Sequence, residues 1–257
     1  LMASVRAWKI VVALNLFAAI TWTTYFIAVQ LIEPAVVFTI FSGMVPLGTI
    51  MGNWMGLPEA ISPKRRLVCV GNAIILLSII MLAAMTVFGW SGFVRGGWLA
   101  AMSGVGLAAL SGGCTAFAIL YSIRLNSKGV GPLAQFGLRF VLYALIAGIA
   151  YMIGLDDKGS STPSSDLKWI VLIGLAVIAF PLYLVQKAVP LVTASAIAAV
   201  TSLGPVMVFV MQLIDGRVLY SHATLVGLAV YMSGALMATW GATRMQNPQH
   251  FPTSAEV

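Results

Sequence analysis

Charged residues are scarce in this sequence. Only 8% of its 257 residues are Asp, Glu, Lys or Arg, whereas 60% are hydrophobic, and the mean hydropathy is +1.00. Soluble domains are about a quarter charged, so the composition excludes an ordinary soluble protein. A membrane β-barrel is excluded as well, because its strands give short alternating segments and not continuous apolar runs. The sequence therefore predicts an all-α polytopic membrane protein.

Cysteine and histidine are scarce too, with two residues of each. Cys69 and Cys114 fall inside apolar runs, which favours two small buried hydrophobic side chains over a disulfide or a metal site. His222 lies at the start of an apolar run and His250 lies in the C-terminal tail, far apart in the sequence. We expect no metal ion and no cofactor.

Long apolar runs are abundant. A helix needs about 20 apolar residues to cross a hydrocarbon core of about 30 Å. The sequence holds eight such predicted transmembrane helices: Ile10 to Val29, Pro34 to Trp54, Leu67 to Phe88, Trp98 to Leu120, Pro132 to Ile153, Trp169 to Gln186, Leu191 to Leu213, and Ala223 to Trp240. The longest polar interruption, residues 155–168, is rich in Gly, Ser and Asp and is predicted to be a loop.

Basic residues between the runs indicate how the chain is oriented. Cytoplasmic loops carry an excess of Lys and Arg, and counting by alternate sides gives nine against four. The nine are Arg6, Lys9, Lys64, Arg65, Arg66, Arg124, Lys128, Lys187 and Arg244, and the four are Arg95, Lys158, Lys168 and Arg217. The first side, with both chain termini, is therefore predicted to be cytoplasmic. Because the net charge of +7 is spread over these loops, it does not indicate nucleic-acid binding.

An internal repeat is visible when the sequence is aligned with itself at an offset of 159. The stretch "PAVVFTIFSGMVP" then meets "TASAIAAVTSLGP", which pairs Pro46 with Pro205 and, four positions earlier, Ser42 with Thr201. The last three predicted helices thus correspond to the first three. We therefore predict that residues 91–243 form a complete five-helix unit, that residues 1–90 hold the last three helices of an equivalent unit, and that residues 244–257 form a disordered cytoplasmic tail.

Two units of five helices have opposite orientations in the membrane, because five is an odd number. This is the inverted-repeat plan of secondary transporters. The repeat leaves the first unit two helices short, so we expect a ten-helix protein in which two further helices precede Leu1. The eight helices alone should then not transport, since half of the cavity wall would be missing.

Three stretches and their order carry a resemblance to a known family. They are "LNLFAAITWTTYFIAVQLIEPAVVFTIFSGMVPLG", "CTAFAILYSIRLNSKGVGPLAQFGLRFVLYALIAG" and "VLIGLAVIAFPLYLVQKAVPLVTASAIAAVTSLGPVMVFVMQLIDGR". The chain resembles the EamA-like transporters of the drug/metabolite transporter superfamily. It departs from them in its two missing opening helices, and in "QLIDGR", which stands where the family commonly has a Gly-Glu turn.

The resemblance implies export or exchange of small metabolites, often amino acids or related compounds, across the bacterial cytoplasmic membrane. The substrate would lie in a central cavity lined by both units. The expected partners are this small molecule and the lipid bilayer, and a homodimer is left open.

The two aligned prolines are candidate hinges. A proline inside a helix costs about 3 kcal/mol and frees the carbonyl four residues back. For Pro46 that carbonyl belongs to Ser42, and for Pro205 it belongs to Thr201. A hydroxyl one turn before each proline predicts a kink with a polar spot that lines the cavity; a static kink that improves packing is the alternative.

Polar aromatic and hydroxyl residues supply further candidates for substrate binding. Trp22 and Tyr25 share one face of the first predicted helix near the middle of the membrane, either as substrate contacts or buried between helices. Tyr183 is predicted to be the counterpart of Tyr25 in the second unit after a slip of one residue from the offset of 159. The fourth predicted helix carries a stripe of small residues, which favours close packing, although Ser111 and Thr115 in this stripe could line the cavity.

One charge lies inside a predicted helix. Arg139 is about 10 Å into the membrane by helical rise, where an unpaired charge costs about 2.5–3.5 kcal/mol. It is predicted either to reach the cytoplasmic rim or to attract an anionic group of the substrate. No acid lies inside a predicted helix, since Glu33 only precedes one, where it suits the helix dipole. Ion coupling then resides in the missing helices, or the protein is a facilitator or exchanger.

Two other functions compete with transport. A flippase-like subunit for a lipid-linked group would share the predicted fold. A membrane-embedded enzyme is disfavoured, because no His or carboxylates cluster within the apolar runs and Asp156 and Asp157 lie in a loop. No Gly-rich phosphate-binding loop is present either. We therefore expect a transporter and not an enzyme.

Overall fold

The computed structural model describes residues 7–57, 66–155, 164–180, 183–184, 202–216 and 221–243. Within these ranges the protein is all-helical, and six spans are long and apolar enough to cross a membrane. They are α2 (Trp8–Leu31), α3 (Pro34–Trp54), α4 (Arg66–Val87), α5 (Gly97–Ser127), α6 with α7 (Pro132–Leu138 and Val141–Met152) and α12 (His222–Thr243). The protein is therefore a multi-pass α-helical membrane protein.

Two shorter helical segments follow in the C-terminal half. Helix α8 (Ser164–Gly174) continues into the π-helical turn Leu175–Ala179, and α11 spans Gly204–Asp215. They fall within or next to the predicted sixth and seventh transmembrane helices, and the remaining parts of those two predictions lie outside the described residues. Helix α3 has the predicted bounds, Pro34 and Trp54. It opens with a proline because the first turn needs no N–H donor at that position.

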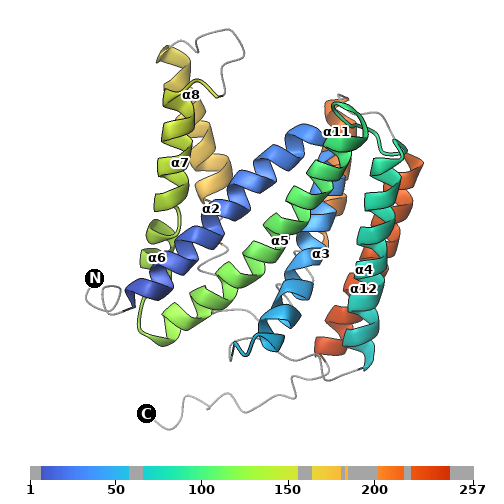
Figure 1. Ribbon diagram of the computed structural model, residues 1–257, viewed down its shortest axis with the longest axis horizontal. Coiled ribbons are helices and arrows are strands. Elements are labelled where there is room, and N and C mark those ends of the chain that lie inside the picture. Colours follow the sequence, from blue (N-terminus) through green and yellow to red (C-terminus); the bar gives the residue numbers. More distant parts are fainter. Residues whose placement is uncertain are drawn as a thin grey trace, which may run out of the picture.

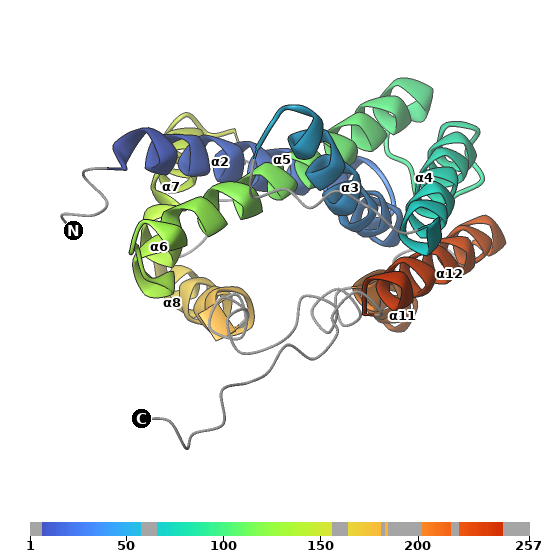
Figure 2. The same ribbon diagram turned by 90° about the horizontal axis from the view of Figure 1, so that it is seen from below.

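The helices are arranged around three central ones. Helices α6 and α8 lie on one side, α4, α11 and α12 lie on the other, and α2, α3 and α5 lie between them (Figure 2). Helix α2 packs along α5, α5 along α3, and α4 along α12, while α11 contacts α3 and α7 contacts α2. Helices α2 and α3 of the predicted first unit therefore lie between two parts of the second, and the main hydrophobic core is built from both units.

The bundle has two ends that differ in structure. One end, the lower one in Figure 1, is called the Trp54 end. Helices α3, α5 and α12 end there, and α4 begins there. The opposite end, where α3 begins, α4 ends and α12 begins, is called the Glu33 end. Arg66 at the start of α4 and Arg124 in the last turn of α5 lie at the Trp54 end, so the orientation predicted from the charge bias would place this end in the cytoplasm.

Small residues bring neighbouring helices into close contact. A Cβ atom on Gly112 of α5 would overlap the carbonyl oxygen of Phe41 in α3. Two hydrogen bonds join α2 and α5. The hydroxyl of Ser111 donates to the carbonyl oxygen of Thr21 (2.9 Å), and the hydroxyl of Thr21 donates to the carbonyl oxygen of Ser111 (3.3 Å). Ser111 is completely buried. Ser111 therefore joins two helices, as expected from close packing, and does not line a cavity.

The predicted fifth transmembrane helix is one crossing but not one continuous helix. Helices α6 and α7 are separated by Arg139 and Phe140. The side-chain oxygen of Asn15 in α2 accepts a hydrogen bond from the N–H of Leu142 (3.2 Å). This bond satisfies a donor in the first turn of α7, where helices lack internal partners. A continuous apolar run cannot reveal such a break, because the stabilising acceptor comes from another helix.

The two aligned prolines lie in different helical settings. Pro46 lies inside α3, which continues through it. Pro205 lies in the first turn of α11, where a proline interrupts no helical hydrogen bond. Because residues 191–201 of its predicted helix lie outside the described ranges, the equivalence of the two prolines stays a prediction.

Candidate functional site

A cavity of about 550 Å³ lies between α3, α4, α5, α12 and the start of α11. Its lining, among the described residues, consists of Phe38, Phe41, Ser42, Val45, Pro46, Val68, Asn72, Ile75, Thr115, Ile119, Ser202, Gly204, Tyr231, Ala235, Ala238, Thr239 and Ala242. The cavity uses the first half of α4 and the second half of α12, so it lies towards the Trp54 end. None of these lining residues is charged.

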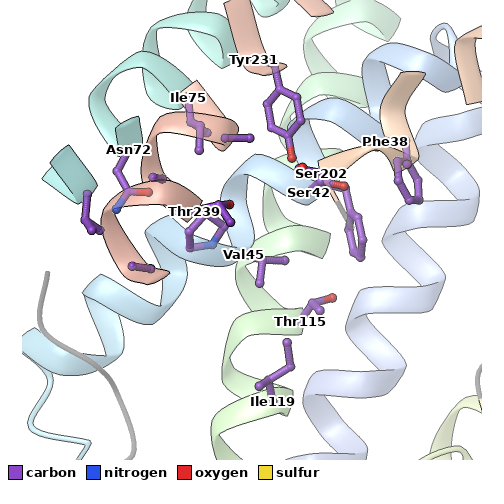
Figure 3. A pocket seen from close by; sticks show the side chains of 17 residues that line it. Phe38, Ser42, Val45, Asn72, Ile75, Thr115, Ile119, Ser202, Tyr231 and Thr239 are labelled. Atoms are coloured by element: carbon purple, nitrogen blue, oxygen red, sulfur yellow. The ribbon is translucent and has the colours of Figure 1, made fainter. Parts of the chain in front are cut away.

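A few polar side chains interrupt the apolar wall. They are Ser42, Asn72, Thr115, Ser202, Tyr231 and Thr239. Figure 3 shows the hydroxyl of Tyr231 directed towards Ser42 and Ser202, and the side chains of Tyr231 and Ser42 are hydrogen-bonded. Hydroxyl and amide groups can each donate and accept. An apolar wall with a small number of converging polar groups is typical of sites for small molecules.

Three of the residues predicted from the sequence line this cavity, namely Ser42, Pro46 and Thr115. The hydroxyl of Thr115 also donates to the backbone of its own helix (3.0 Å). Thr201 lies outside the described residues, whereas its neighbour Ser202 lines the cavity. The predicted α3 and α5 positions are therefore brought together, and their role in binding stays a prediction.

Trp22 and Tyr25 lie behind the cavity and not in its lining. The ring of Tyr25 packs edge-on against Phe41 and Phe38, which do line it, with centroid distances of 5.3 and 6.4 Å. Trp22 packs against Tyr25 at 6.3 Å. Its indole Nε1 is buried and has no hydrogen-bond partner among the described residues. An unpaired buried donor costs about 1–3 kcal/mol, which a polar ligand reaching Nε1 would recover.

Arg139 and Tyr183 belong to a second aromatic group on the other side of α2. The guanidinium carbon of Arg139 lies 5.3 Å from the centre of the Phe140 ring, which is 6.2 Å from Trp22. Tyr183 packs edge-on against Phe136 at 6.1 Å. The Nε of Arg139 is buried and, within the described ranges, has no hydrogen-bond partner. The structure therefore brings Arg139 near Trp22, at a break in the membrane-crossing chain.

Sequence reasoning missed the burial of Glu33. This residue is completely buried, and its carboxylate accepts hydrogen bonds from the side-chain amide of Gln212, the hydroxyl of Thr224 (2.7 Å) and the N–H of Gly92 (2.8 Å). The helix dipole accounts for an acidic residue directly before α3. It does not predict that three donors from distant segments bind the carboxylate of Glu33. The available signal was a lone amide, Gln212, in an apolar stretch that offers it no local partner.

Metal-binding residues do not gather in the part of the chain that the structure describes: no three His, Cys, Asp or Glu side chains lie together there. Cys114 is a buried thiol, as expected, whereas Cys69 is exposed because it lies on an outward face of α4. No protein-family model matches the chain, and neither a curated protein nor a solved structure matches it. The resemblance to EamA-like transporters therefore stays a prediction from the sequence.

Proposed function

We propose that this protein is a secondary transporter of small metabolites, such as amino acids or related compounds, and that it acts as an exporter, exchanger or facilitator. The observation that carries the proposal is the cavity of about 550 Å³ between membrane-spanning helices of both predicted units. Transporters place their substrate sites between internal repeats within the membrane, and this cavity is enclosed by α3 and α4 of one unit and α5, α11 and α12 of the other.

The chemistry of the cavity suits a molecule with an apolar part and neutral hydrogen-bonding groups. Phe38 and Phe41 offer aromatic surface, and Ser42, Asn72 and Tyr231 offer polar groups. Hydrogen bonds of this kind fix the orientation of a ligand, while the apolar wall supplies most of the buried contact area. We infer two further donors for a more polar part of a substrate, the Nε1 of Trp22 and the Nε of Arg139, which lie outside the cavity lining and have no hydrogen-bond partner among the described residues.

The proposed setting is the bacterial cytoplasmic membrane, with both termini in the cytoplasm. The nine-to-four distribution of basic residues supports this orientation. The proposed architecture is a ten-helix inverted repeat of the EamA-like kind, supported by the alignment of α3 with the α11 region at an offset of 159. In this arrangement Pro46 lies in the cavity wall, where a bend of α3 would change the width of the cavity.

The test is a transport assay with the full-length protein in proteoliposomes, screened for uptake and efflux of pooled amino acids and other metabolites. Two serines give a matched pair: Ser42 lines the cavity, whereas Ser233 is exposed on α12. Replacing Ser42 by alanine should slow transport about fivefold, the equivalent of about 1 kcal/mol for one hydrogen bond. Ser233→Ala should leave the rate unchanged.

The same preparation separates transport from its nearest alternative. A flippase-like subunit would move labelled lipids between leaflets and would take up none of the pooled metabolites. Uptake that is equally affected by Ser42→Ala and Ser233→Ala would contradict the assignment of the cavity as the substrate site.

A further inference from the structure

The buried carboxylate of Glu33 joins helices from both predicted units. Glu33 directly precedes α3, and its side chain accepts hydrogen bonds from Gln212 on α11 and Thr224 on α12. Both polar atoms of the Gln212 amide are hydrogen-bonded: its nitrogen donates to Glu33, and its oxygen accepts a hydrogen bond from the N–H of Ala35 in α3 (3.2 Å). Hydrogen bonds to a charged group are the strong ones in proteins. These contacts therefore hold α3 against α11 and α12 at one end of the bundle.

Apolar packing seals the same end. Ala35, Phe209 and Leu228 form a buried cluster directly beside the carboxylate network, with exposed fractions of 0%, 5% and 3%. Ser221, just before α12, donates to the carbonyl oxygen of Trp90 in the loop between α4 and α5 (2.7 Å). The loop, α3, α11 and α12 are therefore joined at the Glu33 end, whereas the cavity lies towards the Trp54 end.

The predicted internal repeat does not reproduce the Glu33–Gln212 contact at the opposite end of the bundle. At the offset of 159, Glu33 corresponds to Val192 and Gln212 corresponds to Asn53. In an inverted repeat, the pair that closes one end of the protein has its counterpart at the opposite end. That counterpart has a valine in place of the acid, so it cannot form the same carboxylate–amide contact. The sequence thus supplies this polar contact at the Glu33 end alone.

We propose that Glu33, Gln212 and Thr224 form a latch that closes the Glu33 end, and that the latch opens and closes in each transport cycle. The inference rests on the proposed transport function. A transporter must close one end while the other is open. A hydrogen-bonded contact suits this task, because water replaces the amide and hydroxyl donors when the helices separate, so that opening leaves no group unpaired. The valine at the mirrored position leaves the opposite end without this contact, which favours a resting state open towards the Trp54 end.

The test measures access to a residue behind the latch. Cys69 and Cys114 are replaced by alanine in the full-length protein, and Leu228→Cys is introduced as a reporter. Oriented membrane vesicles are treated with a membrane-impermeant maleimide from the Glu33 side. The latch variants are Gln212→Leu and Glu33→Gln, the second of which keeps the shape of the side chain. Gln135→Leu is the matched control, since Gln135 is also buried and donates to the carbonyl oxygen of Val130 on another part of the protein (2.7 Å).

Both latch variants should raise the labelling rate from the Glu33 side about tenfold, the effect expected from losing one hydrogen bond to a charged group, and the control should not. An unchanged rate overturns the latch. So does an equal rise from both membrane faces accompanied by a lower melting temperature, because that result marks a general loosening. If Gln212→Leu does not fold, Glu33→Gln decides.

Metabolite uptake measured on the same vesicles keeps the two proposals apart. Uptake by the unmodified protein, together with unchanged labelling in the latch variants, overturns the latch and leaves the transport function standing. Absence of uptake by the unmodified protein overturns the transport function instead.

Discussion

The two ends of the bundle share helices α3 and α12 but are built in different ways. At the Glu33 end, a completely buried carboxylate with three hydrogen-bond donors holds α3, α11 and α12 together. At the Trp54 end, α3, α4 and α12 enclose a cavity with scattered hydroxyl groups. Membrane helices gain little from hydrophobic association, because lipid is as apolar as their own side chains. Polar contacts and close packing therefore decide where they meet and where they leave room.

The largest expected effect follows from removing the carboxylate. Glu33→Ala leaves the amide of Gln212 and the hydroxyl of Thr224 buried without their acceptor, and each unpaired buried group costs about 1–3 kcal/mol. We expect a loss of about 3 kcal/mol in the free energy of unfolding, measured by denaturation in detergent micelles. A loss below about 1 kcal/mol would show that the carboxylate of Glu33 does not hold the helices together at this end.

A smaller effect is expected where α5 meets α3 beside the cavity. Gly112→Ala places a methyl group on the carbonyl oxygen of Phe41, whereas the adjacent Gly113→Ala meets no atom within 4 Å. Overpacking of this kind costs about 1–3 kcal/mol, while alanine in a free helical position is neutral or slightly stabilising. Gly112→Ala should therefore lower the melting temperature, and Gly113→Ala should leave it unchanged or raise it slightly. Equal melting temperatures of the two variants would contradict the close contact of α5 with α3.

The aromatic residues behind the cavity should affect transport more than folding. Trp22→Ala removes an indole donor that has no partner in the described part of the chain, and Tyr25→Phe removes the hydroxyl of a ring that packs against Phe38 and Phe41 of the cavity wall. Each should lower the transport rate, by about tenfold for Trp22→Ala if one hydrogen bond and its ring contacts are lost, with folded protein still in the membrane. Joint loss of folding and activity would favour a purely structural role. Normal rates would remove both residues from the substrate path.

The smallest effect is expected at the hydroxyl pair between α2 and α5. Ser111→Ala removes the hydrogen bond to the carbonyl oxygen of Thr21 (2.9 Å). Interhelical hydrogen bonds in membrane proteins contribute about 0.6 kcal/mol on average, so we expect a loss of that order in unfolding experiments and no change in transport. A loss comparable to that of Glu33→Ala would mean that polar contacts stabilise both regions equally.

Features that depend on composition were predictable, and features that depend on distant partners were not. The bounds of α3 follow from an apolar run that begins with a proline. The break at Arg139 depends on an acceptor from Asn15, 127 positions from Leu142, and the burial of Glu33 depends on Gln212, 179 positions away. Neither pairing leaves a local sequence pattern.

The cavity lining was predictable only in part for the same reason. Ser42 and Thr115 were found because they are small polar residues in apolar helices, one near a proline and one in a small-residue stripe. Asn72 and Tyr231 were not named, although both line the cavity. Their spacing within α4 and α12 does not distinguish the inward face, since these helices are apolar on every side.

The difference between the two ends is tested most directly by cysteine accessibility along one helix. Thr239 lines the cavity and Leu228 is buried behind the Glu33 network, and both belong to α12, about 16 Å apart by helical rise. In the protein without its native cysteines, an impermeant maleimide should label Thr239→Cys from the face at the Trp54 end much faster than it labels Leu228→Cys from either face. Labelling of Leu228→Cys with protection of Thr239→Cys would contradict the account.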